Sequence, residues 1–335
     1  MNDEVREPVL EVRDLHTVVR TDGHDLPVVR GVSFDVRAGE AVALVGESGS
    51  GKSLTALSVM GLLPDAARVV GGSVRLGGRD LQSLPESERR RTRGAQIAMV
   101  YQDPMTSLNP LMRVGSQVVE ALDAHGVPRD EARRRAVEAL GGAGLPRPER
   151  VARRYPHELS GGQRQRVMIA MAIALRPTVL IADEPTTALD VTIQQQVLAL
   201  VDELRRATGL ALIWITHDLG VVARVADRVL VMYAGQVVEA GPTRDLYRAP
   251  QHPYTAGLLG SIPPMLGTER PDLLQIGGAP PDLARRPSGC AFHPRCPQRV
   301  DRCVEEEPVL KPRGENLAAC WVPRDHWVPA ERAVS

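Results

Sequence analysis

Residues Gly46 to Ser53 read GESGSGKS and carry the strongest chemical signal in the sequence. They follow an apolar run and open a helix-like run, which is the context of a phosphate-binding loop. Glycines let backbone N–H groups face phosphates, and a helix start adds a favourable dipole. Lys52 is predicted to contact the β- and γ-phosphates of a nucleotide, and Ser53 to bind Mg²⁺. The predicted nucleotide-binding residues are Gly46, Glu47, Ser48, Gly49, Ser50, Gly51, Lys52 and Ser53. The alternative is a glycine-rich turn without a ligand.

A second segment, Val179 to Glu184, is an apolar run that ends in two carboxylates. Asp183 is predicted to hold Mg²⁺, directly or through water. Glu184 is placed to polarise an attacking water as a general base. The alternative is a helix cap, because Glu184-Pro185-Thr186 also suits the start of a helix.

The elements that must position these residues are short apolar runs without alternation, as in buried parallel strands. Each run ends in a polar residue or glycine, and parallel sheets bind ligands beyond the carboxyl ends of their strands. We therefore expect one ligand site at four strand ends. The runs are Ala41–Val45 before Gly46, Ile97–Tyr101 before Gln102, Val179–Ala182 before Asp183, and Leu210–Ile215 before Thr216 and His217.

The rest of the chain predicts an α/β domain with a helical insertion and an appendage. Helix-like runs at 113–124 and 130–140 indicate a helical subdomain over about 104–165, and 162–175 reads as a buried helix ended by Pro177. Hairpins are expected near 69–78 and 229–238. From about residue 250 prolines become frequent and periodicity fades. The predicted domains are 1–250, with a parallel sheet core, and a cysteine-containing extension at 251–335.

Bulk properties exclude some functions. The 335 residues fit a domain of about 250 plus an appendage. A formal net charge of zero and 3% aromatic residues argue against nucleic-acid binding. The longest apolar run, Val167 to Leu175, is short of the roughly 20 residues of a spanning helix. The first residues carry no apolar secretion signal, so the sequence predicts a cytoplasmic protein.

Leu159 to Gln163 reads LSGGQ, and with it the sequence resembles the ABC ATPase family, whose signature this is. A serine hydroxyl and glycine amides at a helix start form an anion site. The resemblance implies that this site faces the γ-phosphate bound to the other subunit of a dimer. The predicted trans signature comprises Leu159, Ser160, Gly161, Gly162 and Gln163. The alternative is a simple helix cap.

Other positions follow the same family. Gln102 resembles the Q-loop glutamine, which contacts Mg²⁺ or water, and His217 resembles the switch histidine at the γ-phosphate. Asp190, in Ala188-Leu189-Asp190, resembles the D-loop aspartate. The resemblance thus gives Glu184, His217 and Gln102 as catalytic residues, and Ser53, Gln102 and Asp183 as the Mg²⁺ site. One departure concerns adenine: Val19 stands where the family has a stacking aromatic residue, and His16 or His24 is a candidate replacement.

The segment Pro250 to Thr255, reading PQHPYT, and the later cysteine segment resemble the C-terminal extension of oligopeptide and dipeptide (peptide/nickel) importer ATPases. The resemblance implies an ATP-hydrolysing subunit on the cytoplasmic face of the membrane. Its implied partners are a second ATPase subunit, identical or related, two transmembrane permeases and an extracytoplasmic peptide-binding protein. Nickel or oligosaccharide import and export remain alternatives. A non-transport ABC protein fits less well, because coiled coils and a second ATPase domain are missing.

Four cysteines, Cys290, Cys296, Cys303 and Cys320, fall within one short segment, which indicates a shared ligand set. Disulfides are disfavoured in a reducing compartment. Some peptide-importer ATPases with a similar extension carry an iron–sulfur cluster, so the resemblance implies a [4Fe–4S] cluster with a structural role. Zn²⁺ and free thiols are the alternatives, although zinc sites usually take cysteines in closer pairs.

Overall fold

Two compact units make up the chain in the computed structural model, which describes residues 7–103, 107–187, 189–262 and 276–327. Unit 1 consists of residues 1–11, 35–41 and 75–214, and unit 2 of residues 12–34, 42–74 and 215–335. Several strands run from one unit into the other along the chain. Each unit is therefore described by itself.

Unit 1 combines parallel strands with a group of helices. Strand β6 pairs in parallel with β7, in register from Ile97↔Val179 to Val100↔Ala182. The elements lying wholly in this unit are β5 (Arg79–Asp80), α2 (Glu86–Thr92), β6 (Ile97–Val100), α4 (Val114–Asp123), α5 (Arg129–Gly142), α6 (Pro148–Val151), the 3₁₀ turn η1 (Pro156–Glu158), α7 (Gly161–Ile173), β7 (Val179–Asp183) and α8 (Val191–Thr208).

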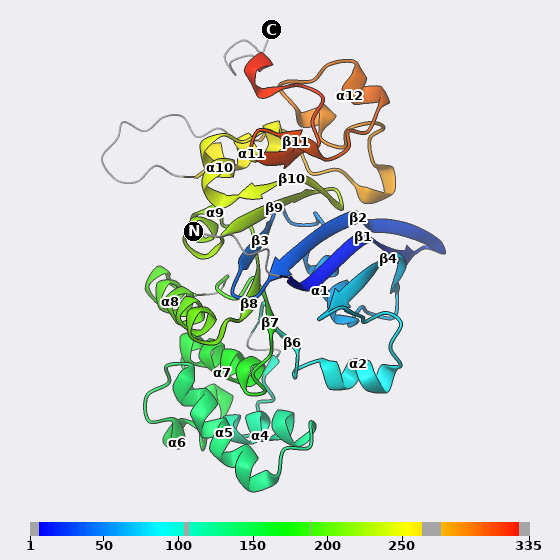
Figure 1. Cartoon of the computed structure of the whole chain (residues 1–335). Helices are drawn as coiled ribbons and strands as arrows, with labels where there is room; N and C mark the ends of the chain where they lie inside the picture. The colour runs from blue at the N-terminus through cyan, green and yellow to red at the C-terminus, as the bar shows by residue number, and fades with distance from the viewer. Residues whose placement is uncertain (1–6, 104–106, 188, 263–275, 328–335) are drawn as a thin grey trace, which may run out of the picture. The chain divides into compact units, whose positions relative to one another are not determined.

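The helices of unit 1 form a layer of their own, visible in Figure 1 as α4, α5, α6 and α7 side by side. Val118, Leu122, Leu140 and Ile169 are fully or almost fully buried within them. The predicted helical runs at 113–124 and 130–140 are confirmed as α4 and α5. Helix α7 is buried at six of its 13 residues, including the run from Val167 to Ala170, so the predicted burial holds for only part of the helix; it ends at Ile173, two residues earlier than predicted.

Unit 2 is built on strands. Parallel to β3 lies β9, which pairs antiparallel with β10, and β12 joins β10 to β11. Within unit 2 this gives the strand order β11-β12-β10-β9-β3, and a second sheet contributes the order β2-β1-β4 there. The strands are β1 (Pro8–Thr21), β2 (His24–Arg37), β3 (Ala41–Val45), β4 (Ala67–Leu76), β8 (Ala211–Thr216), β9 (Arg228–Tyr233), β10 (Gln236–Pro242), β11 (Lys311–Arg313) and β12 (Asn316–Ala318), of which β1, β2, β3, β4 and β8 begin or end in unit 1.

The helices of unit 2 are short. They are α1 (Lys52–Met60), α9 (Leu219–Val225), α10 (Thr243–Arg248), α11 (Pro253–Gly260) and α12 (Arg302–Glu305), with 3₁₀ turns η2 (Leu283–Arg285), η3 (His293–Arg295) and η4 (Arg324–His326). Several helix starts are capped by the preceding side chain. Asp218 accepts hydrogen bonds from the first turn of α9, and His252 accepts one from Tyr254 at the start of α11.

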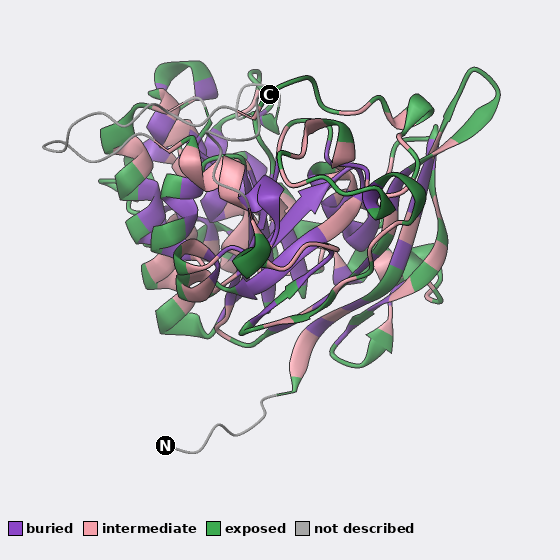
Figure 2. Ribbon diagram, turned by 90° about the horizontal axis from the view of Figure 1, so that it is seen from above, coloured by how far each residue is buried: buried purple, intermediate pink, exposed green. Residues whose placement is uncertain are grey.

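Burial explains why the strand runs lack alternation. Every residue of β3, β7 and β8 is buried, and Figure 2 shows buried strands in purple. Strands covered on both faces need apolar side chains at successive positions. The four predicted strands are therefore confirmed, as are the hairpins β4–β5 and β9–β10.

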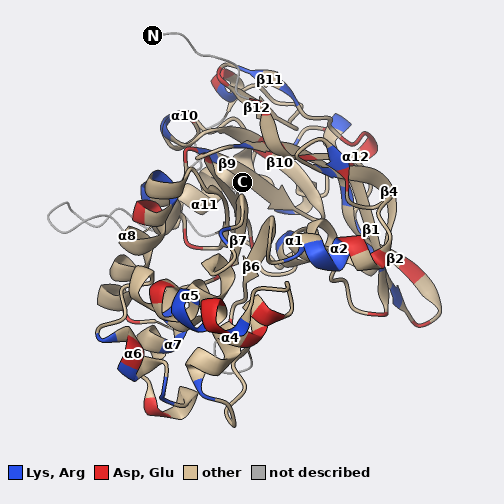
Figure 3. Cartoon of the chain, turned by 60° about the horizontal axis from the view of Figure 1, so that its bottom comes forward, with Lys and Arg blue, Asp and Glu red and all other residues tan. Residues whose placement is uncertain are grey.

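The surface carries both signs of charge. Figure 3 colours the positions of acidic and basic residues, and both kinds occur together on α2 and on α5. Such mixing gives no single-sign face on these helices of the kind that attracts a polyanion. Within the described residues, no helix has both the length and the apolar content to cross a membrane.

Residues beyond 250 belong to the same compact unit as the phosphate-loop segment. Tyr254 and Phe292 from this part pack on Tyr233 of β9 in one buried cluster. The domain boundary near residue 250 stays a prediction, but the later residues contribute core to unit 2 and not only a tail.

The buried carboxylate of Glu239, on β10, holds residues beyond 250 against this strand through hydrogen bonds. Its oxygens accept hydrogen bonds from the backbone N–H groups of Gln251 (2.7 Å) and His252 (2.9 Å) and from Nδ2 of Asn316 (3.0 Å). Burial raises the pKa of Glu239, and the N–H donors act in the opposite direction. One side chain therefore links β10, the start of α11 and β12.

We expect Glu239→Ala to lower the free energy of unfolding by about 3 kcal/mol or more, because two buried donors and one part-buried donor lose their acceptor and each unsatisfied group costs about 1–3 kcal/mol. Urea unfolding of the full chain, followed by circular dichroism, measures the change. The exposed neighbour Glu315→Ala is the matched control and should stay within about 0.5 kcal/mol of wild type. Equal unfolding midpoints for the two variants would show that Glu239 does not fasten the segment.

Candidate functional site

The predicted phosphate loop lies between β3 and α1 in unit 2. Gly46, Gly49 and Gly51 have φ values of 150°, 79° and 100°, in the region that favours glycine. At Gly51 a Cβ would lie 2.7 Å from the carbonyl oxygen of Val28, so close packing also requires glycine there. The sequence therefore folds into a tight turn that leads directly into the helix.

Lys52 closes over this loop. Its side chain is buried, and Nζ donates hydrogen bonds to the carbonyl oxygens of Gly46 (2.8 Å) and Glu47 (2.9 Å). The ammonium group thus lies at the mouth of the turn, where a phosphate would offer it stronger, charged acceptors. Ser53, the predicted Mg²⁺ ligand, is exposed one residue later.

In unit 1, two predicted catalytic residues lie in direct contact. Asp183 is the last residue of β7 and is buried, and Glu184 follows it. Nε2 of Gln102 donates a hydrogen bond to Oε2 of Glu184 at 3.0 Å, although 82 positions separate them. The strands before them, β6 and β7, are parallel neighbours, which brings their carboxyl ends together.

Glu184 is held in an unusual conformation. Its φ is 45°, which a residue with a Cβ adopts at a cost of about 1–2 kcal/mol. Thr187 also donates from Oγ1 to Glu184 Oε2 at 2.9 Å. The sequence reasoning missed Thr187; its place three residues after the carboxylate was the available signal. Strain of this kind at a polar strand end is typical of functional residues.

The signature serine and the D-loop aspartate both act as helix caps here. Ser160 accepts from the N–H of Gln163 (3.3 Å), and Gln163 Oε1 accepts from the N–H of Ser160 (3.1 Å), a capping box at the start of α7. Asp190 caps α8 through Ile193 (2.9 Å). Ala188 lies outside the described residues. A cap does not exclude a second role, so the action of Ser160 across a dimer stays a prediction.

The remaining predicted residues lie in unit 2. His217 directly follows β8 and is exposed. Val19 on β1 is partly exposed, His16 Nε2 lies 3.0 Å from Asp14 Oδ1, and His24 Nδ1 lies 3.0 Å from a backbone oxygen. Both histidines therefore have local hydrogen-bond partners. Which side chain stacks on adenine stays a prediction, as does the joining of all four strand ends into one site.

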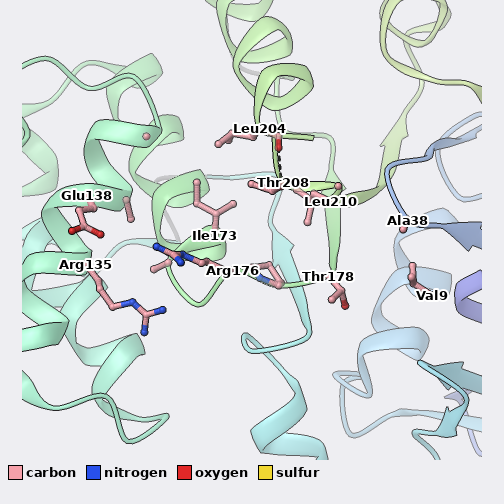
Figure 4. A pocket seen from close by; sticks show the side chains of 15 residues that line it. Val9, Ala38, Arg135, Glu138, Ile173, Arg176, Thr178, Leu204, Thr208 and Leu210 are labelled. Carbon is pink, nitrogen blue, oxygen red and sulfur yellow. Dashed lines mark hydrogen bonds between the residues drawn. The ribbon is translucent and has the colours of Figure 1, made fainter. Parts of the chain in front are cut away.

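A cavity of about 430 Å³ in unit 1 lies elsewhere (Figure 4). Thr178 and Leu210, which line it, immediately precede β7 and β8, and Ile173, Arg176 and Leu204 are also among its lining residues. These positions mark the amino ends of the strands. The predicted nucleotide residues follow the carboxyl ends, so this cavity is not the predicted nucleotide site.

The four cysteines form no disulfide. The N–H of Cys290 donates to the carbonyl of Cys303 (2.8 Å), and the N–H of Gln298 donates to Sγ of Cys296 (3.4 Å). Burial raises the pKa of the Cys290 thiol to about 11 and that of Cys296 to about 12, and neighbouring cysteines add to both shifts. Burial thus keeps the thiols of Cys290 and Cys296 protonated near neutral pH.

Geometry does not support a site for a single metal ion. Among the residues that the structure describes, no group of three or more His, Cys, Asp or Glu side chains is placed to hold one. A tetrahedral zinc with Zn–S bonds of about 2.3 Å requires sulfurs about 3.8 Å apart. The predicted metal binding of the cysteines is thus unsupported by the arrangement of the side chains.

Comparison with known proteins identifies two matching families. The family described as "ABC transporter" matches residues 29–187, and the one described as "Oligopeptide/dipeptide transporter, C-terminal region" matches residues 238–303. The second match contains three of the four cysteines.

Curated relatives match over nearly the whole chain. The oligopeptide transport ATP-binding protein OppD of Mycobacterium bovis is 52% identical over 93% of this chain and 52% of its own length. OppD of Salmonella typhimurium is 49% identical, with 94% of each chain covered. The dipeptide transport ATP-binding protein DppD of Bacillus subtilis is 50% identical, with 94% and 95% covered. This chain spans about half the length of the mycobacterial relatives it matches.

A solved structure shows a similar fold. It is a dimeric ATP-binding cassette in a post-hydrolysis state, bound to ADP and Pi. The TM-score is 0.63 at 28% identity, covering 70% of this chain and 99% of the other.

Proposed function

This chain belongs to the ABC transporter family of ATP-binding proteins, with the oligopeptide/dipeptide transporter C-terminal region, and on that premise we propose that it hydrolyses ATP to power the import of dipeptides or oligopeptides. The observation that carries the ATPase proposal is the Gln102–Glu184 hydrogen bond beside buried Asp183. The family's C-terminal region supports peptides as cargo over the alternatives, which are nickel, an oligosaccharide, or export.

In the proposed reaction, backbone N–H groups of the phosphate loop and the Lys52 ammonium bind the phosphates of ATP. Ser53 and Asp183 offer the hard oxygen ligands that Mg²⁺ prefers, and Gln102 a further one. Bound Mg²⁺ would neutralise charge on the phosphates. Glu184 accepts the proton of the attacking water, while Gln102 and Thr187 keep its carboxylate oriented. His217 would contact the γ-phosphate.

The proposed assembly is larger than this chain. It comprises a second ATPase subunit, two permeases and an extracytoplasmic peptide-binding protein, with this chain held on the cytoplasmic face of the membrane by the permeases. The second ATPase subunit is supported by the dimeric state of the similar cassette, and a role in transport by the relatives' names. The permeases and the binding protein are what the resemblance to peptide importers implies. Closure of two ATPase subunits on two ATP molecules would drive the permeases between facing states.

Reconstitution tests the proposal. The chain is co-expressed with candidate permeases of a peptide importer, and the complex is placed in liposomes with a peptide-binding protein. We expect ATP hydrolysis to rise when peptide is added, together with uptake of labelled peptide. Nickel and an oligosaccharide serve as parallel substrates. The proposed function would be contradicted if the chain purified without the permeases, or if the liposomes took up neither a dipeptide nor an oligopeptide.

We also propose that Cys290, Cys296, Cys303 and Cys320 bind a structural [4Fe–4S] cluster. Four thiols without disulfides suit such a cluster, which spaces its thiolates more widely than one ion does. Burial raises the pKa of the Cys290, Cys296 and Cys320 thiols, so their thiolates would require a bound cation, and a cluster would hold together a segment poor in regular structure.

Metal analysis after anaerobic purification tests the cluster. We expect about four irons and four acid-labile sulfides per chain, with a broad visible absorption that fades in Cys303→Ser. Zinc without labile sulfide would identify the alternative, Zn²⁺. A chain free of both metals would refute any metal role for these cysteines.

A further inference from the structure

Glu47, in the phosphate loop, forms hydrogen bonds with two residues from the C-terminal extension of the same unit. Both guanidinium ends of Arg295 donate to its carboxylate, Nη1 to Oε2 at 2.6 Å and Nη2 to Oε1 at 2.9 Å. The hydroxyl of Tyr254 accepts the backbone N–H of Glu47 at 2.8 Å. These partners lie 248 and 207 positions along the chain from the loop.

Arg295 is built into its place. Only 6% of its side chain is exposed, and it lies over the rings of Tyr233 and Phe292, each centroid 5.9 Å away. Nε donates to the carbonyl of Gly277 at 2.9 Å. Because the donors of the planar Arg295 guanidinium point in fixed directions, this buried group restricts the position of the Glu47 carboxylate more than an exposed ion pair would.

The hydrogen bonds that hold Glu47 extend to Lys52, the residue predicted to contact the phosphates. The carbonyl of Glu47 accepts a hydrogen bond from Lys52 Nζ, so one residue is held through its carboxylate, its N–H and its carbonyl. Arg295 also lies on turn η3, between Cys290 and Cys296, where the N–H of His293 donates to the carbonyl of Cys290 (2.9 Å). The cysteine-bearing turn is therefore connected to the phosphate loop by an unbroken series of contacts.

We infer that Arg295 is a positioning residue for the phosphate loop, through which the C-terminal extension sets the affinity for nucleotide. Because the Arg295–Glu47 pair shapes the turn before nucleotide arrives, its loss leaves the loop to be ordered by the ligand, which weakens binding. The chemistry of Asp183 and Glu184 is not touched by this pair. The inference rests on the proposed ATP binding.

The test measures MgATP binding to the full chain and, in the assembled transporter, KM and kcat. We expect Arg295→Gln to raise the Kd and the KM for MgATP about ten-fold or more, with kcat within about two-fold of wild type. Arg295→Lys keeps the positive charge but loses the two-pronged guanidinium, so its Kd and KM for MgATP should lie between those of wild type and Arg295→Gln. The control is Arg286→Gln, which breaks the Arg286–Glu307 pair (3.0 Å) in the same extension without contact to the loop.

Glu47→Gln weakens the same ion pair by changing its partner in the phosphate loop. This variant can be measured even if Arg295→Gln does not fold. The Kd of the double variant should equal that of the single variants, since both remove one interaction. The inference would be overturned if the increases in Kd of the two single variants multiplied in the double variant. It would also be overturned if Arg295→Gln and Glu47→Gln bound MgATP as tightly as Arg286→Gln does. A wild-type chain that binds no MgATP would instead overturn the proposed function.

Discussion

Glu184→Gln should abolish turnover while MgATP binding persists. The amide has the shape of the carboxylate but cannot accept the proton of the attacking water, and general-base catalysis contributes about 10²–10⁴-fold. Steady-state hydrolysis in the assembled transporter should therefore fall by at least about a hundred-fold. Binding depends on the phosphate loop, so the Kd for MgATP should change little.

The contact with Gln102 sharpens this expectation. Nε2 of Gln102 donates to Oε2 of Glu184, and a glutamine at 184 can still offer its oxygen to that donor. The local structure should thus survive, which separates loss of chemistry from loss of fold. Glu203→Gln, the same change at an exposed position of α8, is the matched control. Hydrolysis near the wild-type rate in Glu184→Gln would remove the general-base assignment.

Mixed dimers should reveal on which subunit Ser160 acts. If a homodimer forms, we expect a Ser160→Arg chain paired with a Lys52→Ala chain to recover activity, although each variant alone is inactive. When Ser160 serves the nucleotide of the partner, one of the two composite sites in this mixed dimer keeps both residues. Activity should then reach about half that of wild type if the sites work independently.

Purification through two different affinity tags isolates the mixed dimers. The reciprocal control pairs a wild-type chain with a chain carrying both substitutions. Action across the dimer leaves this control with no intact site, whereas action within one subunit leaves it one. Recovery in the reciprocal control, and none in the first mixture, would place Ser160 beside the nucleotide of its own subunit.

Much of the local architecture could be predicted from sequence because its causes are local. Glycine spacing specifies the turn before Lys52, and uninterrupted apolar runs specify buried strands. The meeting of Gln102 with Glu184 follows from two such strands lying parallel, as β6 and β7 do. The fold class required no information beyond these patterns and the LSGGQ resemblance.

Contacts that depend on tertiary packing could not be foreseen. Nothing in the sequence around Glu47 indicates Arg295 or Tyr254, because their meeting depends on how the extension packs against β9. Cysteine spacing likewise fixes neither the distances between the sulfurs nor what they bind, so the cluster rests on resemblance and donor chemistry.

The pairing of β12 with β10 has a consequence for solubility. Without residues 311–318, β10 would end its sheet with unpaired N–H and C=O groups, a template for another chain's strand. Strand β12 covers that edge, and β11 becomes the outermost strand. It reads Lys311, Pro312, Arg313: two charges flank a residue that has no N–H to donate. The extension therefore closes the sheet with a strand unsuited to further pairing, and shortened chains would be prone to aggregate through the uncovered edge.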